Sequence, residues 1–179
     1  MNADAILHYW FHELQPRDWW SKNERIDNAI ARRFGATLVA GRRGELQDWR
    51  DSPRGRLAEI IVLDQFSRQI HRDTAEAFAA DGMALVLAQE AVRSGADLGL
   101  AGAERAFLYM PFMHSESPAM QSISVRLFDQ PGLEDNLKFA RAHKVIIDRF
   151  GRYPHRNRAL GRTSTAEEEA FLQQPGSGF

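Results

Sequence analysis

The stretch that decides the fold is Leu57–His71, which reads LAEIIVLDQFSRQIH. Its apolar residues recur at helical spacing, and Ser52 followed by Pro53 supplies an N-cap and a favoured first helical residue. The sequence therefore predicts a helix from Pro53 to Ile70. Asp64 lies in its middle with apolar residues on both sides, where a carboxylate needs partners because an isolated buried charge is costly.

Helical periodicity continues along the rest of the chain, and no segment shows the period-two alternation of a strand bounded by hairpin turns. Caps, glycines and prolines predict helices over residues 3–14, 23–40, 53–70, 73–94, 102–110, 117–128, 133–150 and 165–173. Pro111 is expected to end the fifth of them. We predict an all-α fold of about eight helices in antiparallel hairpins, with one domain over residues 1–173 and a frayed tail over residues 174–179.

Composition excludes several classes of function. The 179 residues include no cysteine, which excludes disulfides, a thiolate nucleophile and cysteine-based metal sites. A formal net charge of −1 argues against a nucleic-acid-binding surface. The phosphate-binding, dinucleotide-binding, zinc-protease and serine-hydrolase motifs are missing. With no signal-peptide pattern and no apolar run near the roughly 18 residues of a spanning helix, we expect a cytoplasmic protein without membrane contact.

The polar residues of the helix expected at 53–70 form the first candidate site. On a period of 3.6 residues, Asp64, Arg68 and His71 share one face with the apolar Leu57 and Ile61. In a functional interpretation this face is one wall of a polar cavity. In a structural interpretation Asp64 and Arg68 form a pair within the helix, and His71 lies near the helix end.

A second candidate lies in the segment PFMHSES at residues 111–117. We expect His114 and Glu116 in a short extended connector, where alternate side chains can lie on one side of the backbone. A histidine and a carboxylate in this arrangement suit an acid/base pair or a metal. The structural alternative is a histidine near a helix cap and a surface glutamate.

The third candidate is Arg149–Arg162, RFGRYPHRNRALGR, with five arginines, one histidine and no acid. Such a concentration of guanidinium groups suits a phosphate or carboxylate site. Alternatively, these arginines neutralise buried carboxylates such as Asp64 and Asp81, or face water. His143 lies on an apolar face of the helix expected at 133–150, where a histidine is more often a core residue than a ligand.

Four separated motifs carry a resemblance: LDQFSR at residues 63–68, YMPFMHSE at 109–116, FGRYPHRN at 150–157 and LGR at 160–162. Together they resemble the bacterial domain-of-unknown-function family 924 over essentially the whole chain. The resemblance implies a helical fold similar to the tetratricopeptide-repeat superfamily, and it implies no activity. Ser67 and Gln69 depart from the proline and asparagine that are usual in the family.

These motifs lead to one prediction, a buried polar pocket that binds a small anionic molecule and, if catalytic, hydrolyses or transfers it. The candidate catalytic residues are Asp64, His114, Glu116 and His155, and the candidate ligand-binding residues are Arg68, His143, Arg152, Arg156, Asn157 and Arg162. His114 or His155 would act as the general base. No cofactor is assigned, and a divalent metal on His114 and Glu116 is the weaker alternative. In a different class, the hairpins form a peptide-binding scaffold whose polar network is purely structural.

Overall fold

The computed structural model describes residues 2–178. Every regular element in this range is helical and none is a strand, so the all-α prediction is confirmed. The α-helices are α1 (Ala3–His8), α2 (Glu24–Arg42), α3 (Pro53–Ile61), α4 (Ser67–Ile70), α5 (Asp81–Arg93), α6 (Gly102–His114), α7 (Pro118–Phe128), α8 (Glu134–Phe150) and α9 (Ala166–Leu172). Shorter helical turns are η1 (Tyr9–Glu13), η2 (Pro16–Trp20), η3 (Gln47–Asp51), η4 (Val62–Phe66), η5 (Ala75–Phe78), η6 (Ala96–Gly99) and η7 (Pro154–Arg156). The turn η1 continues α1, and η4 joins α3 to α4 into one continuous helix. The nine α-helices of the described range therefore form eight continuous helices, and the remaining short turns lie between them.

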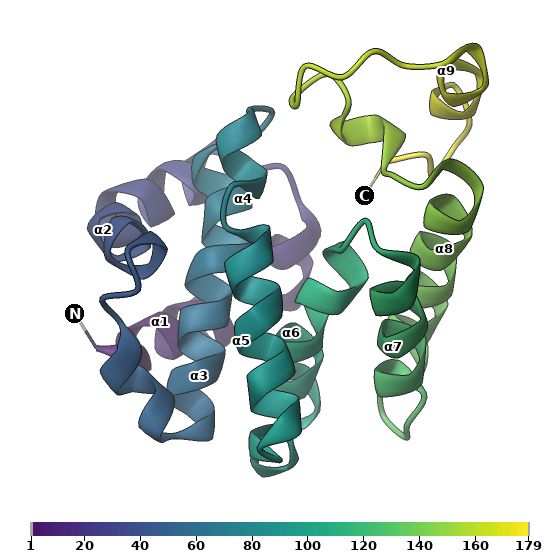
Figure 1. The fold of residues 1–179 in the computed structure, drawn as a ribbon. Helices are drawn as coiled ribbons and strands as arrows, with labels where there is room; N and C mark the ends of the chain where they lie inside the picture. Colours follow the sequence, from purple (N-terminus) through teal and green to yellow (C-terminus); the bar gives the residue numbers. More distant parts are fainter. Residues whose placement is uncertain (1, 179) are drawn as a thin grey trace.

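Alternating helix direction brings one set of helix ends together (Figure 1). Followed from blue to green, the continuous helix 53–70 rises, α5 descends, α6 rises, α7 descends and α8 rises. The predicted antiparallel hairpins are therefore confirmed, whereas the tetratricopeptide-like assignment stays a prediction, as do the domain limits. The ends of helix 53–70, α6 and α8 and the starts of α5 and α7 share the upper edge in this view. The segment after α8 lies at the same edge.

Helix 53–70 begins as its sequence predicts. The Ser52 hydroxyl accepts a hydrogen bond from the backbone N–H of Gly55 at 3.1 Å. Position 55 requires glycine, because a Cβ there would lie 1.8 Å from the carbonyl oxygen of Trp49. Val62–Phe66 then form a π-helical turn in which all five residues are buried. Such turns occur often at functional sites, and this one surrounds Asp64 with protein on every side.

Aromatic side chains fix this helix in the core. Trp10, Phe66 and Phe107 are at most 2% exposed. The Trp10 ring lies 5.7 Å from that of Phe66 and 5.4 Å from that of Phe107. These contacts join η1, η4 and α6, so the turn that carries Asp64 is held rigidly against two other segments.

Pro111 does not end its helix, and the prediction of an end there is wrong. α6 continues through Pro111 to His114. Its last carbonyl groups are satisfied by later side chains: Tyr153 Oη and Gln121 Nε2 both donate to the Met113 oxygen, at 2.6 and 2.7 Å. His114 is therefore the last residue of a helix rather than part of a connector, and side chains from distant segments satisfy the Met113 carbonyl at the helix end.

The predicted start of the fourth helix at residue 73 is also wrong. Asp73 has a left-handed backbone with φ of 62°, and the short turn η5 follows before α5 begins at Asp81. The break places Asp81 in the first turn of α5. A carboxylate in that position lies near the positive end of the helix dipole.

The C-terminal part follows its sequence signals. Thr165 and Glu168 form the predicted capping box of α9, and Gly151 ends α8 with φ of 68°. In the predicted tail, the Ser177 hydroxyl donates to the Leu172 carbonyl at 3.1 Å, and position 179 lies outside the described residues, as does position 1. None of the described helices is long and apolar enough to cross a bilayer.

Candidate functional site

The π-helical turn η4 and the end of α6 hold a buried carboxylate–imidazole pair. Asp64 is 1% exposed, and its Oδ1 lies 2.7 Å from Nδ1 of His114 at the end of α6. The amide of Gln65 also donates to the carboxylate, at 2.5 Å. Nε2 of His114 has no hydrogen bond to any residue between 2 and 178. One ring nitrogen is thus held by Asp64, and the other has no hydrogen bond among the described residues.

Two arginines complete the charge cluster around this pair. Arg68 lies 2.9 Å from the Asp64 carboxylate and makes two 2.9 Å contacts with the Asp81 carboxylate. Arg156 reaches the same Asp81 through a longer contact of 3.2 Å and donates to the backbone oxygen of His114 at 2.9 Å. Two carboxylates and two guanidinium groups therefore balance formally, with Arg156 the less closely paired of the two arginines.

The pKa values of the pair follow from burial and the neighbouring charges. Burial raises the pKa of Asp64, but Arg68 and His114 outweigh it and lower the pKa to about 2. The pKa of His114 is lowered by burial, and the charges of Arg68 and Arg156 act in the same direction against that of Asp64. The imidazole is therefore neutral at pH 7, and its hydrogen bond to Asp64 assigns the proton to Nδ1.

The two arginines respond differently to their surroundings. Burial lowers the pKa of Arg68, but Asp64 and Asp81 outweigh it, so the net shift is upward. The pKa of Arg156 is lowered by burial and by the charge of Arg68. Arg156 is 6% exposed, and its Nε is buried without a hydrogen-bond partner among the described residues. The guanidinium of Arg156 is therefore incompletely compensated.

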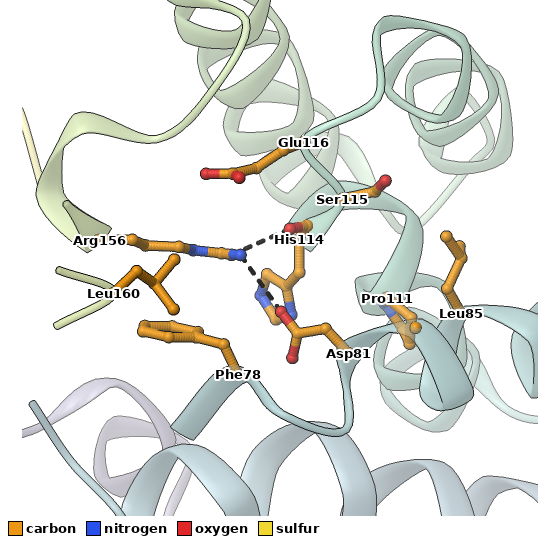
Figure 2. Close-up of a pocket in the computed structure, with 10 residues that line it drawn as sticks. Phe78, Asp81, Leu85, Pro111, His114, Ser115, Glu116, Arg156 and Leu160 are labelled. Carbon is orange, nitrogen blue, oxygen red and sulfur yellow. Dashed lines mark hydrogen bonds and ion pairs between the residues drawn. The ribbon is translucent and has the colours of Figure 1, made fainter. Parts of the chain in front are cut away.

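A cavity of about 280 Å³ opens beside this cluster (Figure 2). Its polar lining comprises Asp81, His114, Ser115, Glu116 and Arg156, and its apolar lining comprises Phe78, Leu85, Pro111 and Leu160, with Gly82 between. In Figure 2 the Ser115 side chain points away from the imidazole of His114. A histidine, a guanidinium and an apolar wall thus face one small space, without a serine hydroxyl directed at the histidine.

A second network joins Glu116 to the segment after α8. The Glu116 carboxylate accepts two hydrogen bonds from Arg162, at 2.7 and 2.9 Å, and one from the backbone N–H of Tyr153 at 2.7 Å. Burial raises the pKa of Glu116, but the hydrogen bonds from Arg162 and Tyr153 outweigh it and lower the pKa. Nε of Arg162 also donates to the side chain of Asn157, at 2.9 Å.

Arg152 and Asn157 lie further from the cavity. Arg152 makes two contacts with the Glu168 carboxylate, at 2.6 and 2.8 Å, and Asn157 donates to Ser164 at 3.0 Å. The hydrogen bond from Arg152 is the largest cause that lowers the pKa of Glu168, to about 2. Neither Arg152 nor Asn157 lines the cavity.

The other two predicted histidines lie behind the cavity rather than in its lining. Nδ1 of His143 lies 2.8 Å from the Phe139 carbonyl oxygen, and the rings of His143 and His114 are 6.4 Å apart. The ring of His155 lies 5.5 Å from that of Tyr153. Burial is the main cause that lowers the pKa of His143 to about 3 and that of His155 to about 4. Both histidines are therefore neutral at pH 7.

Comparison with known proteins identifies the family. A family model described as a bacterial protein of unknown function, DUF924, matches residues 6–176. The chain belongs to the DUF924 family. Among solved structures it is similar to the protein of unknown function ATU0120 from Agrobacterium tumefaciens, with 37% sequence identity over 96% of each chain and a TM-score of 0.90. No curated protein matches this DUF924 chain.

Asp81 binds both arginines. Its contact with Arg156 is the one that the structural alternative for residues 149–162 predicted. The site of this DUF924 protein also contains groups that the sequence analysis missed: Phe78 lines the cavity, and Gln121 and Tyr153 close the end of α6. For Gln121 no local signal existed, because its partners lie on other helices.

The metal alternative finds little support in the geometry of this DUF924 chain. Among the residues that the structure describes, no three His, Cys, Asp or Glu side chains are grouped so that they could hold a metal ion. Both oxygens of Glu116 accept hydrogen bonds from Arg162.

Proposed function

We propose that the cavity binds a small anionic molecule and that His114 acts on it as a general base in a hydrolytic or transfer reaction. The observation that carries this proposal is the joint position of His114 and Arg156. His114 carries an imidazole Nε2 without a hydrogen bond to any residue between 2 and 178, and Arg156 carries a buried Nε without a partner in the same range. Hydrolysis or transfer of an anionic substrate requires a base and a group that binds the anion, and here both lie on one cavity.

The proposed roles follow from the contacts. Asp64 holds Nδ1–H of His114, which leaves the Nε2 lone pair free to take a proton from water or from a substrate hydroxyl. The oxygen activated in this way attacks the substrate, and the imidazolium then returns the proton to the leaving group. Arg156 binds the anionic group of the substrate and stabilises negative charge that develops next to it. Water is the expected nucleophile in hydrolysis, since the Ser115 side chain points away from His114 (Figure 2).

A supporting role is proposed for the other arginines. Arg162 binds Glu116, Asn157 and the Tyr153 carbonyl, and Arg152 binds Glu168 and the Thr163 carbonyl. Because their donor groups are already used in these contacts, Arg162 and Arg152 are better suited to holding the segment after α8 in place than to binding a ligand. Glu116 and Asn157 share this proposed role, because their polar atoms are used in the same contacts.

The scaffold alternative called for an exposed face lined by aromatic side chains. Among the described residues, the large exposed aromatic side chains are Trp20 in η2 and Phe139 in α8. Because they belong to separate segments, they give less support to a peptide groove than the cavity gives to a small molecule.

The experiment uses calorimetric titration and thermal unfolding with acetate, butyrate, inorganic phosphate and sulfate. Binding of at least one anion is expected to be saturable and to raise the midpoint of unfolding, since a ligand that binds the folded state stabilises it. Arg156→Gln is expected to weaken binding at least tenfold. Arg158→Gln is the matched control, because Arg158 is exposed in the same segment.

Two outcomes contradict the proposal. One is that none of the four anions binds saturably to the wild-type protein. The other is that Arg156→Gln folds, as judged by circular dichroism, and binds as tightly as Arg158→Gln. The general-base role is tested separately by the hydrolysis of 4-nitrophenyl phosphate, 4-nitrophenyl sulfate and mono-4-nitrophenyl succinate, each of which keeps a negative charge for Arg156 to bind. His114→Gln is expected to lower that rate by about 100-fold or more.

A further inference from the structure

We infer that the ligand is a monocarboxylic acid with a short apolar body, whose length is limited at Gly82. This inference rests on the proposed function and adds the chemical class of the anion and a residue that determines specificity. It depends on three features of the cavity: the free edge of one arginine, the charges around it, and the apolar wall opposite.

The geometry of Arg156 favours a planar anion. Its guanidinium carbon lies 4.6 Å from the ring centroid of Phe78 and 4.6 Å from that of Tyr153. With aromatic rings against the group, an anion approaches in the plane of its N–H donors. A carboxylate matches this plane with two parallel hydrogen bonds, whereas a tetrahedral phosphate gains less from it.

Other arginines of the chain show what the edge formed by Nε and Nη2 does when a carboxylate is present. In three pairs both nitrogens donate to one carboxylate at 2.6 to 2.8 Å. The pairs are Arg50 with Glu59, Arg72 with Asp27, and Arg152 with Glu168. In Arg156 the same edge has Nη2 on the His114 carbonyl and Nε without a partner. Nε is closed off from water, so a ligand carboxylate that pairs with this edge has to displace a side chain of the lining and share Nη2 with the His114 carbonyl.

The charges around Arg156 disfavour a multiply charged ligand. Asp81 and Glu116 both line the cavity with Arg156. Their charges are already balanced, since Arg162 pairs with Glu116 and Arg68 and Arg156 share Asp81. Each negative charge of a ligand therefore adds repulsion from these two carboxylates, and a dianionic phosphate faces about twice the repulsion of a monoanion.

The opposite wall suits a hydrocarbon body. Phe78, Leu85, Pro111 and Leu160 line the cavity beside the polar groups. Gly82 lies in the first turn of α5, one turn before Leu85, and a Cβ added there would meet no heavy atom within 4 Å. A larger side chain at position 82 therefore fits the fold and occupies space that the ligand body would use.

The test is calorimetric titration with acetate, butyrate and hexanoate, with hexanamide and hexyl phosphate as matched probes. Affinity is expected to rise about fourfold for each methylene that is buried. Hexanoate is expected to bind at least tenfold more tightly than hexanamide or hexyl phosphate. Gly82→Leu is expected to weaken hexanoate binding at least tenfold and acetate binding less than threefold. Gly35→Leu is the matched control, because Gly35 lies within α2, outside the cavity, and also has no heavy atom near its added Cβ.

The outcomes separate this inference from the proposed function. If hexyl phosphate binds as tightly as hexanoate and depends on Arg156, the carboxylate class is overturned while the anion site stands. If affinity is independent of chain length, or Gly82→Leu behaves like Gly35→Leu, the role of the apolar wall and of Gly82 is overturned. If no carboxylate, phosphate or sulfate binds, both proposals fail.

Discussion

Asp64→Asn tests whether the buried carboxylate acts as an ion in the folded protein. The substitution keeps the size and shape of the side chain and resembles the protonated acid, so its cost corresponds to the free energy of keeping Asp64 ionised. The pKa of Asp64 is lowered from 3.8 to about 2. At 1.36 kcal/mol for each pKa unit, we expect Asp64→Asn to lower the free energy of unfolding at pH 7 by about 2 kcal/mol.

The sign of this effect follows from the direction of the shift. A carboxyl group whose pKa is lower in the folded state stabilises the fold when it is ionised. Its contribution is fully present above the ordinary pKa near 4 and is lost as the pH falls towards 2. The comparison at pH 7 therefore contains the whole contribution, and Arg68 retains Asp81 as a partner in the variant.

The assay is urea unfolding of the wild-type protein and the variant at pH 7, monitored by circular dichroism and tryptophan fluorescence. Asp48→Asn is the control, because Asp48 is exposed. We expect the free energy of unfolding of this variant to lie within about 0.5 kcal/mol of that of the wild type. If Asp64→Asn is also within about 0.5 kcal/mol, the carboxylate is not a stabilised ion and the reasoning about the cluster is refuted.

Three further predictions concern other parts of the structure. Arg162→Gln removes the side-chain partner of Glu116, and we expect it to lower the free energy of unfolding in urea by about 1–3 kcal/mol; an unchanged free energy of unfolding would contradict the supporting role of Arg162. Gly55→Ala places a methyl group 1.8 Å from the Trp49 carbonyl oxygen, so we expect a clear fall of the unfolding midpoint in a thermal melt, and an unchanged midpoint would contradict the close approach. The pKa of His143 is lowered from 6.5 to about 3, so the folded protein resists protonation of this imidazole. Its contribution to the free energy of unfolding is therefore present above pH 6.5 and falls as the pH is lowered from there, by about 1.4 kcal/mol for each pH unit. His143→Gln should reduce the slope of the free energy of unfolding between pH 6 and 4, and an unchanged slope would show that His143 is not the group that titrates.

The sequence was sufficient where local chemistry decides the structure. Ser52 and Thr165 cap the helices that their positions predicted. Periodicity gave the helix class and the hairpins, because burial of one helix face leaves a pattern along the chain.

Contacts between residues far apart in the chain explain where the predictions from sequence failed. Pro111 was expected to end a helix, but donors from Gln121 and Tyr153 satisfy the carbonyl groups beyond it. The concentration of arginines in residues 149–162 was a correct signal of a polar site, but the sequence does not tell which arginine keeps a free edge. Four of them meet acids that lie elsewhere in the chain. These pairs are Arg149 with Glu167, Arg152 with Glu168, Arg156 with Asp81, and Arg162 with Glu116.

The most direct test of the central claim is a nitrogen-15 NMR titration of histidine-labelled protein with hexanoate at pH 7. We predict that His114 is a neutral Nδ1–H tautomer and that its Nε2 resonance shifts saturably with hexanoate. The resonances of the exposed His8 and His12 should not move, and Arg156→Gln should abolish the shift. A His114 resonance that stays constant while hexanoate binds would place the ligand outside this cavity and contradict the proposed role of His114.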